Sequence, residues 1–103
     1  MAGTKVDGVI EAVHYTGEGQ VVWVRAFERR GATFSDWVLI SREDLIGRLK
    51  AGKKYFSGQR KKLQASTFEL AEAVRLEQAS GEDYLAAGKG KPGQDYLEGV
   101  PVI

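Results

Sequence analysis

The chain has no cysteine, and this absence excludes several kinds of site at once. Disulfide bonds, thiolate catalysis and cysteine-ligated zinc or iron–sulfur sites all require that residue. Histidine is nearly missing too: His14 is the single example and stands within a strand pattern. Residues 88–93 match a dinucleotide-binding glycine pattern only formally, because Pro92 stands where a helix should begin. With no P-loop, nucleophile elbow or metal-ligand spacing either, we expect a protein that is not an enzyme and holds no metal or cofactor.

Long apolar runs are also missing from the sequence. No segment approaches the roughly 18–20 apolar residues that span a bilayer. Residues 1–5 (MAGTK) lack the apolar core of a signal peptide. We therefore expect a cytoplasmic protein without membrane contact.

Neither sign of charge is in large excess, but the charges are unevenly placed. The formal net charge is +1. Residues 42–62 contain eight Lys or Arg and two Asp or Glu, whereas residues 63–103 contain three and seven. Such asymmetry favours a region that meets a polyanion, or a basic segment masked by an acidic tail.

The length and composition predict one folded domain followed by a tail. A chain of 103 residues with 43% hydrophobic content suits a single small domain. We place a β-barrel domain at residues 1–79. Residues 80–103 contain five of the 13 glycines and both prolines, and form an acidic tail that is either flexible or docked. Within it, the segment GEDYL at 81–85 returns as GQDYL at 93–97.

The first half of the chain predicts three strands and a short helix. Period-two and β-branched patterns cover residues 6–15, 21–27 and 34–40, and glycine-containing turns separate them. Ser41 begins a capping box before a helix at 42–51, and Gly52 stands where a left-handed C-terminal cap is expected.

The following segments predict further strands. Residues 53–56 and 60–65 flank a tight Ser57-Gly58-Gln59 connection, which indicates a basic hairpin. Residues 66–78 have both helical and strand features, and we prefer a strand because their apolar residues share one face at period two. The fold class expected is mainly β, a five- to six-stranded barrel (OB-like or SH3-like) with one short helix after the third strand and an irregular C-terminal tail.

The basic hairpin is the candidate binding site. It combines cations with two adjacent aromatic residues, a pattern that suits phosphates and stacked bases. Either Tyr55 or Phe56 would stack, because alternation sends them to opposite faces. Strands two and three would add two arginines, while Trp23 and Trp37 are expected in the core. The nucleic-acid-binding residues predicted are Lys53, Lys54, Tyr55, Phe56, Arg60, Lys61, Lys62, Arg25 and Arg29.

Two functions fit this pattern. The first is a non-enzymatic module that binds single-stranded or structured nucleic acid, or another polyanion, through the basic hairpin. The alternative is a protein–protein adaptor or small homo-oligomer that uses residues 80–103 and a sheet edge. Charges on an edge hairpin also have a purely structural use, because they block edge-to-edge aggregation.

Overall fold

The computed structural model describes residues 6–31, 33–60, 68–89 and 93–103. Strands dominate these residues, and the single helix follows the third strand as the sequence predicts. Along the chain the elements are β1 (Gly8–Tyr15), β2 (Val21–Arg30), β3 (Thr33–Ser41), α1 (Arg42–Lys50), β4 (Tyr55–Arg60), β5 (Phe68–Ala79), β6 (Glu82–Ala87) and β7 (Tyr96–Leu97).

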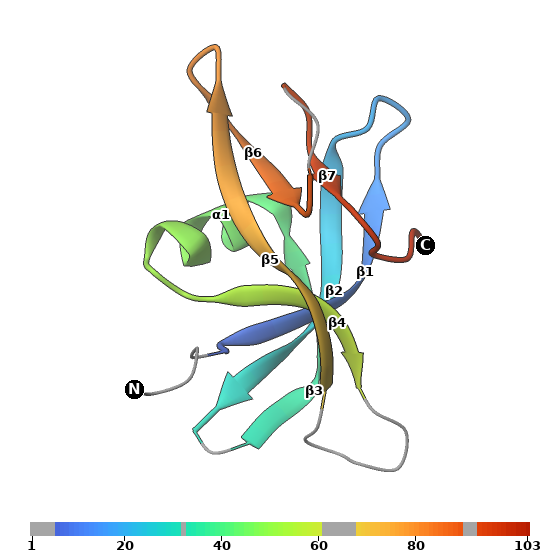
Figure 1. Ribbon diagram of the computed structural model, residues 1–103, viewed down its shortest axis with the longest axis vertical. Coiled ribbons are helices and arrows are strands. Elements are labelled where there is room, and N and C mark those ends of the chain that lie inside the picture. Colours follow the sequence, from blue (N-terminus) through green and yellow to red (C-terminus); the bar gives the residue numbers. More distant parts are fainter. Residues whose placement is uncertain (1–5, 32, 61–67, 90–92) are drawn as a thin grey trace.

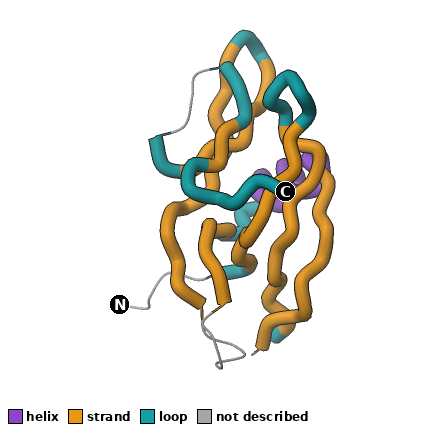
Figure 2. The backbone as a smooth tube through the Cα atoms, turned by 90° about the vertical axis from the view of Figure 1, so that its right-hand side faces the viewer, coloured by secondary structure: helices purple, strands orange, loops and turns teal. Residues whose placement is uncertain are grey.

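The strands form one bent sheet in the order β3-β2-β1-β4-β5-β6-β7. Neighbours are antiparallel except for the parallel pairs β1–β4 and β6–β7. Figure 1 shows β5 crossing β1 and β2 at a steep angle, so that the sheet folds over itself. The C-terminal segment returns to β1, where Val13 pairs with Val102. In Figure 2 the helix lies on the far side of the strands from the C-terminal loop.

The prediction of a five- to six-stranded barrel is wrong. A barrel closes only when its first and last strands pair. Here the sheet is open, and within the described residues β3 pairs with β2 alone. Seven strands are named in that part of the chain, because β5 and the segment after it continue the sheet beyond β4.

The core lies between the folded halves of the sheet. On β2 and β3 the inward positions include Val24 and Ala26, paired with Ile40 and Val38. Leu45 of α1 is fully buried against the same cluster and covers one end of it. Leu85, Leu97 and Val100 complete the cluster from the C-terminal part of the chain. Core side chains therefore come from both sides of the domain boundary predicted at residue 79.

The helix is bounded by the two caps that the sequence predicts. Ser41 has an extended backbone, and its hydroxyl accepts a hydrogen bond from the Asp44 N–H at 3.2 Å. At the other end Gly52 has φ +92°, which a side chain would oppose. The N–H groups of Gly52 and Lys53 donate to the carbonyls of Leu49 and Arg48, both at 3.1 Å. This Schellman motif fixes the direction in which the chain leaves the helix.

The predicted hairpin turn at Ser57-Gly58-Gln59 is wrong, because β4 runs straight through these residues. Ser57 is buried. Its hydroxyl accepts a hydrogen bond from the Glu72 N–H on β5 at 3.0 Å and donates one to the Glu72 carbonyl at 3.3 Å. Gly58 is needed for close approach, since a Cβ there would lie 2.3 Å from the Glu69 carbonyl oxygen. The connection that follows β4 lies outside the described residues.

The strand preferred for residues 66–78 is confirmed where the structure describes it. β5 pairs with β4 on one side and with β6 on the other. β4 pairs with the first half of β5 and β6 with its second half, and this pairing, rather than the high helix propensity of the segment, decides its structure. Residues 66 and 67 lie outside the described residues.

The C-terminal part is docked, and the prediction of an irregular tail is wrong for residues 82–87 and 96–97. β6 and β7 pair in parallel, and the two related segments 81–85 and 93–97 each place a leucine, Leu85 and Leu97, in the core. Asp95 is 2% exposed and accepts hydrogen bonds from the N–H groups of Val21 and Leu85, both at 2.9 Å. Its carboxylate also pairs with Arg42 at 2.8 Å, so the segment is tied to three other elements.

Candidate nucleic-acid interface

The structure places only part of the predicted basic hairpin. Lys53 and Lys54 are exposed in the link between α1 and β4. The backbone of Arg60 ends β4, and its side chain is outside the described part, as are Lys61 and Lys62. Whether the five cations form one surface therefore stays a prediction.

Tyr55 and Phe56 have different environments, as strand alternation requires. Tyr55 is 3% exposed, and its hydroxyl donates to Glu28 Oε2 at 2.6 Å. Burial raises the pKa of Tyr55 far above its ordinary value, and the hydrogen bond to Glu28 raises it further. This burial removes Tyr55 from the predicted contact set. Phe56 is half-buried and lines a surface hollow of about 340 Å³ together with Lys53 and Lys54.

The two predicted arginines of β2 lie on the outer side of the sheet, away from the core. The Arg25 guanidinium is 5.5 Å from the centre of the Trp37 ring, and its Nε is 2.6 Å from Glu11 Oε1. The Arg29 guanidinium lies 4.8 Å from the centre of the Phe34 ring. Both are cation–π contacts, which align a cation and a ring on one surface.

The register explains why these groups share a face. Residues directly opposite one another in an antiparallel pair point to the same side. Arg25 pairs with Leu39, Phe27 with Trp37 and Arg29 with Phe34, while the inward positions pair among themselves. Along its other edge β2 pairs with β1. There Trp23 lies opposite His14, and the two rings stack with centroids 5.1 Å apart. We call this surface the outer face, comprising Trp23, Arg25, Arg29, Phe34, Trp37 and Leu39.

Two large apolar side chains of the outer face are unusually exposed to solvent. Trp37 is 52% exposed and Leu39 is 55% exposed, whereas Trp23 is half-buried and Phe27 is buried. The expectation that Trp37 lies in the core is wrong. In the sequence, Trp37 and Leu39 alternate with Val38 and Ile40, so both faces of β3 are apolar and the pattern cannot say which one is covered.

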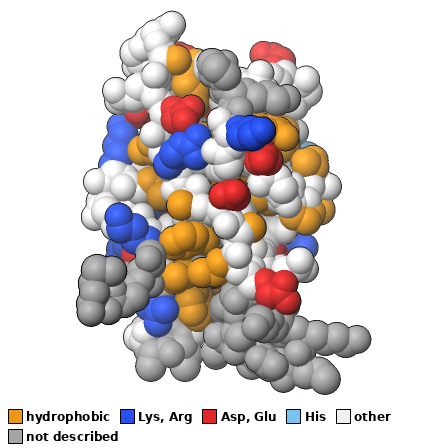
Figure 3. All heavy atoms as spheres, in the orientation of Figure 1, with side chains coloured by type: hydrophobic (Ala, Val, Ile, Leu, Met, Phe, Trp, Pro, Cys, Tyr) orange, Lys and Arg blue, Asp and Glu red, His pale blue; other side chains and the backbone are white. Residues whose placement is uncertain are grey.

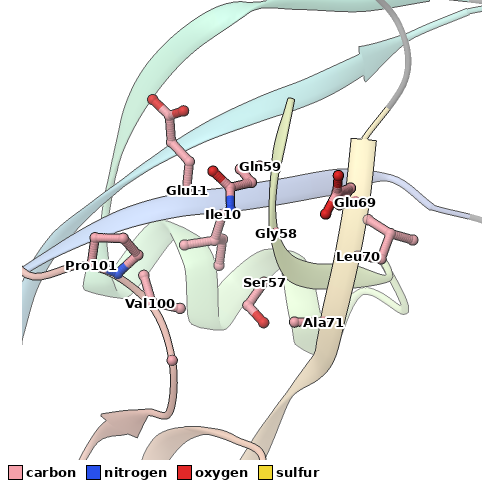
Figure 4. Close-up of a pocket in the computed structure, with 11 residues that line it drawn as sticks. Ile10, Glu11, Ser57, Gly58, Gln59, Glu69, Leu70, Ala71, Val100 and Pro101 are labelled. Atoms are coloured by element: carbon pink, nitrogen blue, oxygen red, sulfur yellow. The ribbon is translucent and has the colours of Figure 1, made fainter. Parts of the chain in front are cut away.

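A second hollow, which the sequence does not indicate, opens where β1 and β4 separate. These strands pair only from Gly8–Tyr55 to Ile10–Ser57, after which the C-terminal segment takes the place of β4 beside β1. The hollow has a volume of about 260 Å³ and lies between β1, β4, β5 and residues 99–101. Figure 4 shows Ile10 and Val100 at this opening, with the Glu11 carboxylate directed away from Ser57. Two of its polar groups, Glu11 and Ser57, are already used by Arg25 and Glu72, and Gln59 and Glu69 also line it.

Charge on the face seen in Figure 3 is mixed, with lysine and arginine interspersed among carboxylates and apolar side chains. A basic region must therefore be local, as the near-zero net charge requires. Among the described residues there is no group of three or more His, Cys, Asp or Glu placed to hold a metal ion. In the same part of the chain no helix is long and apolar enough to cross a membrane.

Comparison with known proteins adds no assignment to this geometry. No protein-family model, no curated protein and no solved structure matches the chain.

Proposed function

We propose that this protein is a non-enzymatic module that binds single-stranded nucleic acid across the outer face of β2 and β3. The observation that carries the proposal is the half-exposed Trp37 ring with the Arg25 guanidinium beside it. The Phe34–Arg29 pair repeats the same combination further along the two strands. The proposal places the protein in the cytoplasm, with nucleic acid rather than a membrane as its partner.

Stacking and phosphate contact together favour this ligand. Aromatic rings stack on any base, so a face of this kind binds without strong sequence preference. Arginine beside a ring supplies the phosphate contact at the same place. Glu11 neutralises part of the Arg25 charge. We therefore expect Arg29 and the exposed Lys53 and Lys54 to carry more of the phosphate binding, together with Arg60, Lys61 and Lys62 as predicted from the sequence.

Removing the exposed tryptophan should weaken binding without affecting the core. We expect Trp37→Ala to lower affinity for a labelled oligothymidine about 5- to 150-fold, the effect of losing one base-stacking platform. The measurement is fluorescence anisotropy at about 50 and 200 mM salt, over which affinity of the native protein should fall steeply as counterions are released. Val22→Ala is the matched control, because Val22 is a 40% exposed apolar residue of β2 that is not part of the outer face.

The outcomes separate the outer face from the basic hairpin. Unchanged affinity in Trp37→Ala would exclude the outer face. If Lys61→Glu with Lys62→Glu then abolished binding, the contact surface would be the connection after β4. Absence of binding by the native protein at low salt would exclude the proposed function itself.

Self-association is a second candidate, and the edge of β3 favours it. β3 has nine residues, pairs only with β2 among the described residues, and contains no lysine, arginine or proline. A long edge strand without lysine, arginine or proline is a template for pairing with another strand. A second copy can pair antiparallel about Trp37, the middle residue, which places the exposed Trp37 and Leu39 of both copies together.

Placing a cation on this edge should separate the two candidates. We expect Leu39→Lys to abolish any dimer seen by sedimentation velocity, because each new lysine would lie diagonally beside Trp37 of the other copy and would place a charge within the paired surface. The same variant should retain nucleic-acid binding, since it adds a positive charge to the outer face. A native protein that stays monomeric at high concentration would contradict the second candidate.

A further inference from the structure

A surface pocket lies where the end of α1 meets the end of β2 and the start of β4. Its volume is about 350 Å³. Four cations and two carboxylates line it, namely Arg29, Arg30, Arg48, Lys53, Asp7 and Glu28. We propose that this pocket binds a phosphate monoester, and that in a nucleic-acid complex it receives the phosphate at the end of the strand. The second part of this proposal rests on the proposed function, whereas the first is testable without it.

The fold holds cations from two separate segments around the pocket. Arg29 and Arg30 end β2, and Arg48 lies in the last turn of α1. The Schellman motif then fixes Lys53 next to Arg48, since the Lys53 N–H donates to the Arg48 carbonyl. Three carbonyls near the helix end, those of Gly47, Arg48 and Leu49, accept hydrogen bonds from the N–H groups of Ala51, Lys53 and Gly52, which reduces their repulsion of an anion here.

The two carboxylates of the pocket are already used inside the protein. Glu28 Oε2 accepts a hydrogen bond from the Tyr55 hydroxyl at 2.6 Å and forms an ion pair with Arg48, whose Nε lies 3.0 Å away. Asp7 Oδ2 accepts from the Lys54 N–H at 2.8 Å. These contacts position Arg48 and the start of β4, and they leave the pocket with more positive than negative charge. A phosphate monoester carries nearly two negative charges at neutral pH, which suits an excess of two cations.

Arg48 offers an observation that points to a missing acceptor. Its Nη1 atom is buried and has no hydrogen-bond partner in the described part of the chain. A buried guanidinium nitrogen without an acceptor is unfavourable, so an acceptor from outside the described residues would relieve this cost. Phosphate oxygens accept from guanidinium groups in paired geometry, and a lysine nearby adds charge without that constraint.

Arg29 connects this pocket to the outer face. It lines the pocket, and its guanidinium lies over the Phe34 ring of the outer face. A strand whose bases stack on the outer face therefore reaches the pocket at the end of β2. A phosphorylated strand end differs from the strand interior because it carries a phosphate monoester, with one more negative charge than the internal diesters and a freer phosphate group.

The experiment compares oligothymidines of one length with a 5′-phosphate, a 3′-phosphate or hydroxyls at both ends. We expect one phosphorylated end to bind about tenfold tighter than the hydroxyl form, the effect of one or two charge-assisted hydrogen bonds. Lys53→Gln should lower the affinity for all three oligonucleotides, because one phosphate contact is lost, and should in addition remove the preference for the phosphorylated end. Lys89→Gln is the control, because Lys89 is exposed and does not line this pocket.

Failure of the pocket and failure of the proposed function give different results. Equal affinity for all three oligonucleotides would overturn the strand-end role while leaving nucleic-acid binding intact. If no oligonucleotide binds, titration with inorganic phosphate, followed by amide chemical shifts, tests the pocket alone. Saturable shifts at residues 48–54 that disappear in Lys53→Gln would support a free phosphate as the ligand, and their absence would overturn the site.

Discussion

Replacing Asp95 by asparagine should lower the free energy of unfolding by about 3–5 kcal/mol, because it breaks a buried ion pair by removing one partner. The Asp95 side chain is fully buried and that of Arg42 is 20% exposed. Asp95 also accepts from two backbone N–H groups that an amide NH₂ cannot serve equally well. The hydrogen bond from Arg42 to Asp95 is the main reason that the pKa of Arg42 is raised. The loss should therefore affect β2, α1 and β6 together.

Urea denaturation followed by tryptophan fluorescence measures this effect. The control is Glu18→Gln, in an exposed turn, which should change stability by less than about 0.5 kcal/mol. A change in Asp95→Asn below about 1 kcal/mol would show that the C-terminal segment is not held by this carboxylate. An unchanged denaturant slope would show that the variant loses stability without a change in cooperativity.

The same substitution, glycine to alanine, should have opposite effects at two positions. In Gly58→Ala the new Cβ meets the backbone of β5, with the Glu69 carbonyl oxygen at 2.3 Å, so the strands must separate. We expect a loss of about 1–3 kcal/mol, the usual range for overpacking. Gly47 lies within α1, and no atom lies within 4 Å of an added Cβ there. Gly47→Ala should instead stabilise the protein by about 0.5–1 kcal/mol through helix propensity.

Thermal and urea unfolding of the two variants test this pair of predictions. A stabilised or neutral Gly58→Ala would mean that β4 and β5 do not approach closely at this point. Such a result would favour the turn at Ser57-Gly58-Gln59 that the sequence predicts. Gly47→Ala is the control, because it adds the same methyl group. A loss of stability confined to Gly58→Ala is therefore specific to that position.

Most local elements of this protein are determined by its sequence. The strands β1, β2 and β3 follow from alternation between glycine-containing turns, and α1 lies between Ser41 and Gly52 because both caps depend on nearby atoms. A strand at β5 was predictable from period two despite helix-forming residues. These features share one cause, namely that residues close in the chain supply the interactions that decide them.

The candidate site was only partly predictable. The charges and Arg25 and Arg29 were visible in the sequence, and alternation required Tyr55 and Phe56 to differ. Which of the two is buried depends on Glu28 of β2, whose carboxylate accepts a hydrogen bond from the Tyr55 hydroxyl. The exposure of Trp37 depends on which face of β3 meets the core. In both cases the deciding residues are distant in the chain, so no local sequence pattern predicts the burial of Tyr55 or the exposure of Trp37.

The sequence by itself determined the helix, the first three strands and the basic character of residues 42–62. Only the tertiary structure decided that β4 passes through Ser57 and Gly58, that Trp37 faces outward and that Asp95 docks the C-terminal segment. Each of these depends on a contact between distant parts of the chain: Gly58 with Glu69, Trp37 with Arg25, and Asp95 with Arg42. Local composition around Gly58 and Asp95 is typical of a turn or a tail. Only contacts with distant residues make these segments parts of the sheet.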